Sequence, residues 1–160
     1  MATVIRGSDN FDTAVTGVLL SGEARSEGGT GSGSTVVMLS TSLNLTGFTG
    51  KRLIAQGTVG INESVNSANT SILRLHLNNG SSTIVIGAIR SGEAHSNNSG
   101  NYIAPITADC VYIIPSSHAT NCTLKMQGGV DSGAFNFGKQ PNYTNFDGEN
   151  AGVTLTYFVI

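Results

Sequence analysis

Apolar and polar residues alternate along most of this chain, and no long segment repeats with the 3.6-residue period of a helix. Residues 37–45 carry apolar side chains at odd positions, with Thr41 as the exception. Residues 53–61 follow the same rule, with Gly57 in the middle of the series. Alternation of this kind is typical of strands that bury one face. We therefore expect both segments to be β-strands.

A β-hairpin is predicted over residues 71–87, S-I-L-R-L-H-L-N-N-G-S-S-T-I-V-I-G. Asn-Gly between two alternating apolar runs is the strongest short hairpin signal. With Asn79-Gly80 as a two-residue loop, Leu75 is expected opposite Ile84.

A second hairpin is predicted around residues 115–118, P-S-S-H. Centred on residue 116, it would place Cys110 directly opposite Cys122, on the same inward face. Directly opposed strand residues have Cβ atoms ~4.5–5.5 Å apart, which is longer than the ~3.8 Å mean of a disulfide. We expect two buried free thiols, with a disulfide as the alternative.

The final strand is expected over residues 153–160, V-T-L-T-Y-F-V-I, and its pattern changes along its length. Threonines occupy one face at first, but the last four residues are apolar on both faces. One face of this strand can pack in the core, but the apolar side chains on the other face must then be buried by another element or another subunit. We expect a neighbouring subunit to bury them, with Tyr157, Phe158 and Ile160 at the subunit interface of a homotrimer.

Counting weaker runs, about eight to ten short strands separated by Gly, Asn and Ser turns are expected, which is typical of a β-sandwich or jelly roll. The fold class predicted is all-β, of jelly-roll or β-sandwich type, with a short extended N-terminal arm. The arm would span residues 1–20, a Gly/Ser-rich linker or loop residues 21–35, and the sandwich domain residues 36–160.

Charge is scarce: 11% of the residues are charged, against a typical ~25%, and the net charge is −2. No basic patch is visible, so nucleic acid is not an expected partner. No stretch approaches the ~20 apolar residues of a membrane span, so no membrane insertion is expected. Ser, Thr, Asn and 21 Gly must form the polar surface, as in virion-exposed proteins.

The sequence is poor in catalytic and metal-binding signatures. The Gly-rich segment 28–35 has no lysine and opens no helix, unlike a phosphate-binding loop. His76, His95 and His118 have no metal-ligand spacing, and no G-x-S-x-G motif occurs. We expect no enzyme activity, no metal and no cofactor.

A possible glycan- or partner-binding surface could be formed by loop residues, because aromatic rings stack on sugars and asparagine side chains bond hydroxyls. Its members are Asn97, Asn98, Tyr102, Tyr143 and Phe146. The alternative is that these are ordinary loop residues, with a few aromatics at the rim of the core.

Several segments together resemble a known family. I-R-G-S-D-N-F-D-T (5–13) is similar to the start of small phage virion proteins and fibre pieces. G-F-T-G-K-R-L-I-A-Q-G-T-V (47–59), then G-A-F-N-F (133–137) and the final strand, follow an order similar to the TNF/C1q-like jelly-roll domains of phage heads and fibre tips. This resemblance implies a homotrimer with the final strand near the three-fold axis, and it implies no catalytic residues.

The expected function is that of a non-enzymatic structural protein of a bacteriophage virion, assembled in the host cytoplasm. The leading form is a trimeric capsid decoration (cement) protein, whose partners would be the major capsid protein or other virion proteins. The alternative is a tail- or head-fibre knob that binds a receptor or a host-surface glycan.

Overall fold

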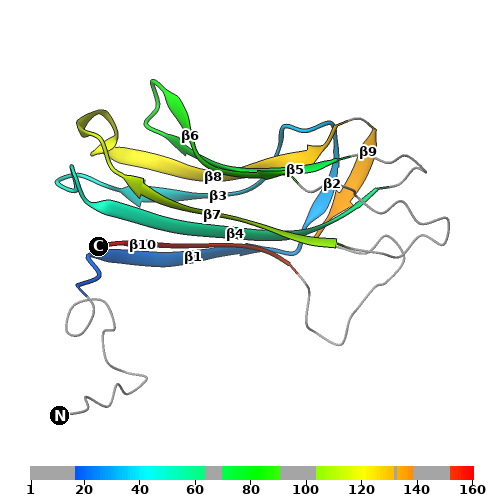
Figure 1. Ribbon diagram of the computed structural model, residues 1–160, viewed down its shortest axis with the longest axis horizontal. Coiled ribbons are helices and arrows are strands. Elements are labelled where there is room, and N and C mark those ends of the chain that lie inside the picture. Colours follow the sequence, from blue (N-terminus) through cyan, green and yellow to red (C-terminus); the bar gives the residue numbers. More distant parts are fainter. Residues whose placement is uncertain (1–16, 64–69, 91–103, 132, 139–151) are drawn as a thin grey trace, which may run out of the picture.

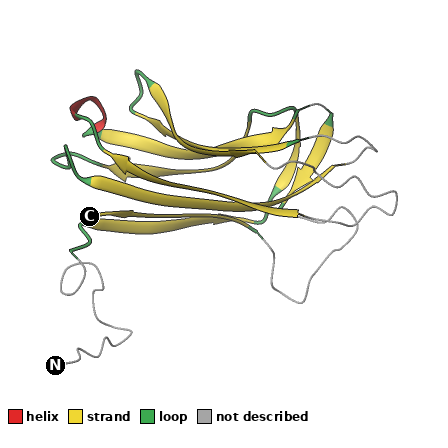
Figure 2. Cartoon of the chain, in the orientation of Figure 1, coloured by secondary structure: helices red, strands yellow, loops and turns green. Residues whose placement is uncertain are grey.

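The computed structural model describes residues 17–63, 70–90, 104–131, 133–138 and 152–160. Within these ranges the chain consists of strands and the turns that join them (Figures 1 and 2). The only regular helix in the described ranges is a short 3₁₀ turn, η1 (Ser116–His118). The all-β prediction is therefore confirmed.

Ten strands lie within the described residues. They are β1 (Leu20–Ser26), β2 (Gly29–Ser32), β3 (Val36–Asn44), β4 (Arg52–Glu63), β5 (Ser71–Asn78), β6 (Thr83–Arg90), β7 (Ala104–Ile113), β8 (Asn121–Val130), β9 (Ala134–Phe137) and β10 (Val153–Val159).

The strands pair as one long hairpin that has been folded up. The innermost pair is β5 with β6, followed outward by β4 with β7, β3 with β8 and β1 with β10, all antiparallel. Along the chain, the two strands of each pair lie on either side of the pair named before it. Nested antiparallel pairing distributed over two sheets is the topology of a jelly roll, so the predicted fold class holds at this level too.

The two sheets lie face to face (Figure 1). Sheet B has the order β3-β8-β5-β6. In sheet A, the long strand β4 pairs with β7 along one edge, and with β10 and then β9 along the other; β1 continues beyond β10, and β2 beyond β9. The C-terminal strand β10 is therefore inserted between β1 and β4.

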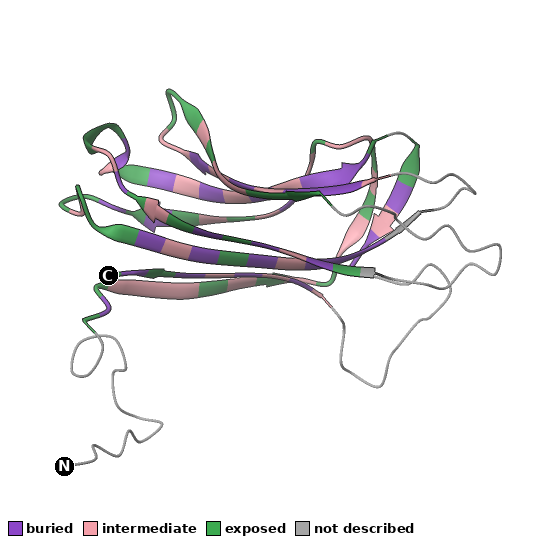
Figure 3. Ribbon diagram, viewed as in Figure 1, coloured by how far each residue is buried: buried purple, intermediate pink, exposed green. Residues whose placement is uncertain are grey.

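The core fills the space between the sheets, and the alternation seen in the sequence decides which side chains enter it (Figure 3). Odd residues of β4 from Leu53 to Ile61, and odd residues of β10, point inward, opposite the leucines of β5. Gly57 occupies an inward position of β4, where an added Cβ would lie 2.4 Å from Met126 Sδ. The glycine that interrupts the apolar series thus makes room for a methionine of the facing sheet.

The predicted hairpin exists, but its loop lies one residue further along than expected. Asn79 N donates to Ser82 O at 3.1 Å, so Gly80 and Ser81 form the loop, and Gly80 has φ +89°. Leu77, not Leu75, is consequently paired with Ile84. A glycine at the first loop position suits a type II′ turn.

The second predicted hairpin is wrong. Residues 115–118 carry the chain from β7 in sheet A to β8 in sheet B, so they form a crossover between the sheets. Cys110 is paired with Ala55, and Cys122 with Leu43. Both cysteines are nevertheless free and buried, as expected.

The linker predicted for residues 21–35 is also wrong, because this segment contains most of β1 and all of β2. β1 pairs with β10 over seven residues, and β2 pairs with β9. Glycine and serine bring little side-chain bulk, and tertiary pairing overrides their weak strand propensity here. Of the predicted arm, residues 1–16 lie outside the described residues.

Candidate functional site

An apolar patch lies on the outer face of sheet A, at the end where the chain terminates. We call it the sheet A patch. It comprises Leu19, Ile54, Val111, Ile113, Phe158 and Ile160.

Strand register assembles this patch in two rows. Phe158 is paired with Ile54, and Ile54 with Val111, so the first row crosses three adjacent strands. In the second row, Ile160 and Arg52 exchange two backbone hydrogen bonds of 2.9 Å, and Arg52 is paired with Ile113. Successive outward residues alternate along each strand, so the two rows are neighbours.

The patch is strongly exposed where it reaches the open edge of β7. Val111 is 68% exposed and Ile113 is 64% exposed, whereas Phe158 is 40% exposed. The rest of the same face is polar: Glu23, Thr156, Gln56 and Asp109 form the next row along the sheet. Beyond that row, the hydroxyls of Thr58 and Thr107 lie 3.0 Å apart. The apolar character is therefore confined to one end of the outer face.

The three residues predicted for a subunit interface separate in the structure. Phe158 and Ile160 lie in the sheet A patch. Tyr157 points the other way, is 8% exposed and packs in the core of the chain. Strand alternation explains the difference, and Tyr157 is not part of the exposed surface.

The remaining patch residues were missed from the sequence, although a signal was present. Residues 111–114 read V-Y-I-I, which is apolar on both faces of a strand, just as residues 157–160 are. The sequence alone does not show that β7 and β10 flank the same strand, β4, so it does not place this run beside Phe158.

The residues predicted for glycan binding, Asn97, Asn98, Tyr102, Tyr143 and Phe146, lie outside the described residues, as does His95. His76 lies on β5, facing outward and half-buried, and His118 lies buried in η1. Within the described ranges, no group of three or more His, Cys, Asp or Glu side chains could hold a metal ion. No helix among those residues is long and apolar enough to cross a membrane.

The two thiols are embedded in the fold. Burial raises the pKa of both Cys110 and Cys122 above the usual value, which keeps them protonated at neutral pH. Cys122 Sγ donates to His118 O at 3.2 Å. Both side chains behave as small apolar groups, and neither is poised as a nucleophile.

The outer face of sheet B is different in character. One row across it contains Ser40, Lys125, His76 and Val85, and the next contains Ser42, Thr123, Asn78 and Thr83. Desolvation by burial lowers the pKa of His76, and the nearby charges of Arg74 and Lys125 lower it further. This face thus carries cations and hydroxyl groups, together with the exposed apolar side chains of Val37 and Val85.

Fold and surfaces together define a β-sandwich of jelly-roll topology with two chemically distinct outer faces. No family model and no curated protein matches the chain. Among solved structures, it is similar to Clostridium thermocellum N-terminal endo-1,4-β-D-xylanase 10B, solved as its CBM22-1–GH10 modules with xylohexaose, at 16% identity and a TM-score of 0.37. The similarity covers 73% of this chain but only 18% of that one, and at this TM-score it carries no conclusion about function.

Proposed function

We propose that this chain is a non-enzymatic structural protein of a bacteriophage virion, acting as a homotrimeric decoration protein on the capsid shell. The observation that carries the proposal is the sheet A patch. Five of its six side chains are large, apolar and exposed by 37–68% in the isolated chain. Contiguous exposed patches of this kind mark interaction surfaces on otherwise polar proteins.

A closed homo-oligomer suits this patch better than an open assembly. The patch lies at one end of sheet A and includes β7, which within the described residues is hydrogen-bonded to β4 on one side only. Closed symmetry covers such a surface on every subunit and leaves no self-adding edge. The trimer, rather than a dimer, follows from the resemblance to TNF/C1q-like jelly-roll domains of phage particles. The charge-poor sequence, rich in Ser, Thr, Asn and Gly, agrees with an exposed virion protein.

The oligomer is tested by placing a charge in the patch. Val111→Asp alters a side chain that is already 68% exposed, so the isolated chain should still fold. In the oligomer the same carboxylate would be buried without a partner, which costs several kcal/mol. Light scattering at micromolar concentration should give the mass of three 16.5 kDa chains for the wild type and of one chain for Val111→Asp.

Val85→Asp is the matched control, because Val85 is 56% exposed but lies on sheet B. It should remain trimeric. A wild-type mass of one chain, or equal dissociation of both variants, contradicts the proposed interface. Electron microscopy with antibody labelling tests the location: label on the head supports a decoration protein, and label at the tail or fibre tips indicates the fibre knob.

A further inference from the structure

The four strands of sheet B carry only positive charge. β3, β5, β6 and β8 contain Arg74, Arg90, Lys125 and His76, and they contain no aspartate or glutamate. The chain as a whole has the opposite balance, with 10 acidic residues against 8 lysines and arginines. On sheet A, acidic Glu23 and Asp109 are mixed with basic residues. Charge is therefore segregated between the two sheets.

Two cations and a histidine gather at the centre of the face; we call them the sheet B cluster: Arg74, His76 and Lys125. His76 and Lys125 are directly paired in register, and Arg74 is the next outward residue on β5. Directly paired residues have Cβ atoms ~4.5–5.5 Å apart. The lowered pKa of His76 has Arg74 and Lys125 among its causes, in agreement with this proximity.

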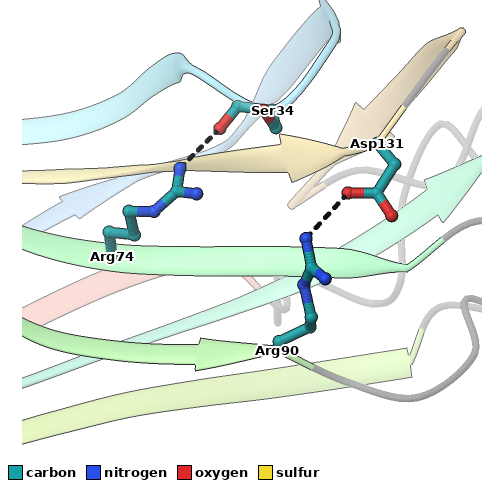
Figure 4. A network of polar contacts seen from close by, with 4 residues as sticks. All are labelled: Ser34, Arg74, Arg90 and Asp131. Atoms are coloured by element: carbon teal, nitrogen blue, oxygen red, sulfur yellow. Dashed lines mark hydrogen bonds and ion pairs between the residues drawn. The ribbon is translucent and has the colours of Figure 1, made fainter.

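The cluster lacks anionic partners within the described part of the chain. There, ion pairs join Arg25 to Glu23 and Arg90 to Asp131. Figure 4 shows that Arg90 reaches Asp131, at 3.4 Å, while Arg74 Nη1 donates to the backbone oxygen of Ser34, at 3.3 Å. Arg90 is thus neutralised, but the charges of Arg74 and Lys125 are not.

His76 adds an unmet hydrogen-bonding group. Its Nε2 is buried and has no hydrogen-bond partner among the described residues. Buried polar atoms are normally satisfied, and an exception calls for an explanation such as an absent ion or partner. With its proton on Nε2, the imidazole would donate to a carboxylate oxygen, which would also neutralise the charges of Arg74 and Lys125.

The composition of the face narrows the class of ligand. The four strands of sheet B contain no Phe, Tyr or Trp, so among the described residues of this face only the half-buried imidazole of His76 could stack on a base or a sugar. Instead, hydroxyl and amide side chains surround the cations, such as Ser40, Thr123 and Gln127. This arrangement suits carboxylates presented by another protein.

We propose that the outer face of sheet B docks onto a carboxylate-rich protein surface, with the sheet B cluster at its centre. The inference rests on the proposed function for the source of that surface, which would be the capsid shell or a neighbouring virion protein. In the trimer, sheet A faces the other subunits and sheet B remains free for this contact.

The test measures binding to immobilised poly-L-glutamate at low ionic strength, with heparin and single-stranded DNA as comparison probes. Lys125→Glu should weaken poly-L-glutamate binding about tenfold or more, since a close charge pair contributes at least about 1.4 kcal/mol. Arg25→Glu is the control, because it reverses a charge on sheet A, where the Arg25 side chain is 75% exposed. It should leave the affinity for poly-L-glutamate unchanged.

Absence of poly-L-glutamate binding overturns the inference, as does equal weakening by Lys125→Glu and Arg25→Glu. Tighter binding of heparin or DNA through the same residues overturns the choice of an acidic protein. None of these results bears on the trimer: a trimer that does not bind poly-L-glutamate leaves the proposed function intact, and a monomer that binds it contradicts only the oligomer.

Discussion

At the scale of single residues, His76 is a titratable group whose pKa is lowered by its surroundings. It lies on the outer face of β5, where burial and the charges of Arg74 and Lys125 lower its pKa. On neighbouring β6 the paired residue is Val85, which has no charge. The folded protein therefore favours the neutral imidazole, and the unfolded chain binds the proton more readily.

The consequence is a loss of stability in acid. As the pH falls through about 6.5, the ordinary value for histidine, the unfolded state takes up a proton first, so the free energy of unfolding decreases. The decrease is complete once the pH is below the lowered pKa of the folded state. Urea denaturation at about pH 7.5 and about pH 5.5 should show a smaller acid loss in His76→Gln than in the wild type.

Lys125→Ala provides the control for that prediction, because it removes one of the two cations but keeps the histidine. Its free energy of unfolding should decrease on acidification by less than that of the wild type and by more than that of His76→Gln. An identical loss in all three proteins would show that other groups govern the acid sensitivity.

At the scale of elements, the turn between β5 and β6 shows how local chemistry decides strand register. Asn79 Oδ1 accepts hydrogen bonds from Ser81 N at 2.9 Å and from Ser82 N at 2.7 Å. Asn79 Nδ2 donates to Ser117 O at 2.7 Å, in the crossover between β7 and β8. One side chain therefore shapes the turn and ties it to the next connection.

Asn79→Ala should lower the free energy of unfolding by about 1–2 kcal/mol, because a net hydrogen bond contributes about 0.5–1.5 kcal/mol and two connections lose support. Asn79→Asp keeps the acceptor for the turn but loses the donor to Ser117. Asn79→Asp should therefore lower the free energy of unfolding by less than Asn79→Ala does. Chemical denaturation measures both, and equal stability of Asn79→Ala and wild type would contradict a structural role for this side chain.

The same turn explains why part of the fold could be predicted from the sequence and part could not. Alternation located β3, β4, β5 and β10, because burial of one strand face is encoded residue by residue. The loop position depended on side-chain acceptors of Asn79, which alternation does not reveal. Strands β1 and β2 depended on partners more than 100 residues away in sequence, so their Gly-Ser composition concealed them.

For the candidate site, the sequence indicated Phe158 and Ile160 because a single strand carries that signal. Ile54 and Val111 join them only through pairing across β4, which is a tertiary property. The sheet B cluster likewise forms from two strands that are far apart in sequence but paired in register.

At the scale of the whole molecule, the sandwich separates two kinds of surface by the thickness of its core. One outer face carries the apolar sheet A patch, and the opposite one carries the cationic sheet B cluster. The proposed function assigns one face to contact between subunits and the other to contact with the shell, so the two faces should act independently. Their chemistry predicts different responses to salt.

Self-association through the sheet A patch should be insensitive to salt, because apolar burial involves no fixed charge and is if anything strengthened by some salts. Docking through the sheet B cluster should weaken steeply, since the Debye length shortens from about 10 Å at 0.1 M to about 3 Å at 1 M salt. Light scattering over that range should therefore report a constant trimer mass while poly-L-glutamate binding is lost. A trimer that dissociates with rising salt would mean that Arg52, which lies between Ile160 and Ile113 in the second row of the patch, holds the subunits together, and would contradict an apolar interface.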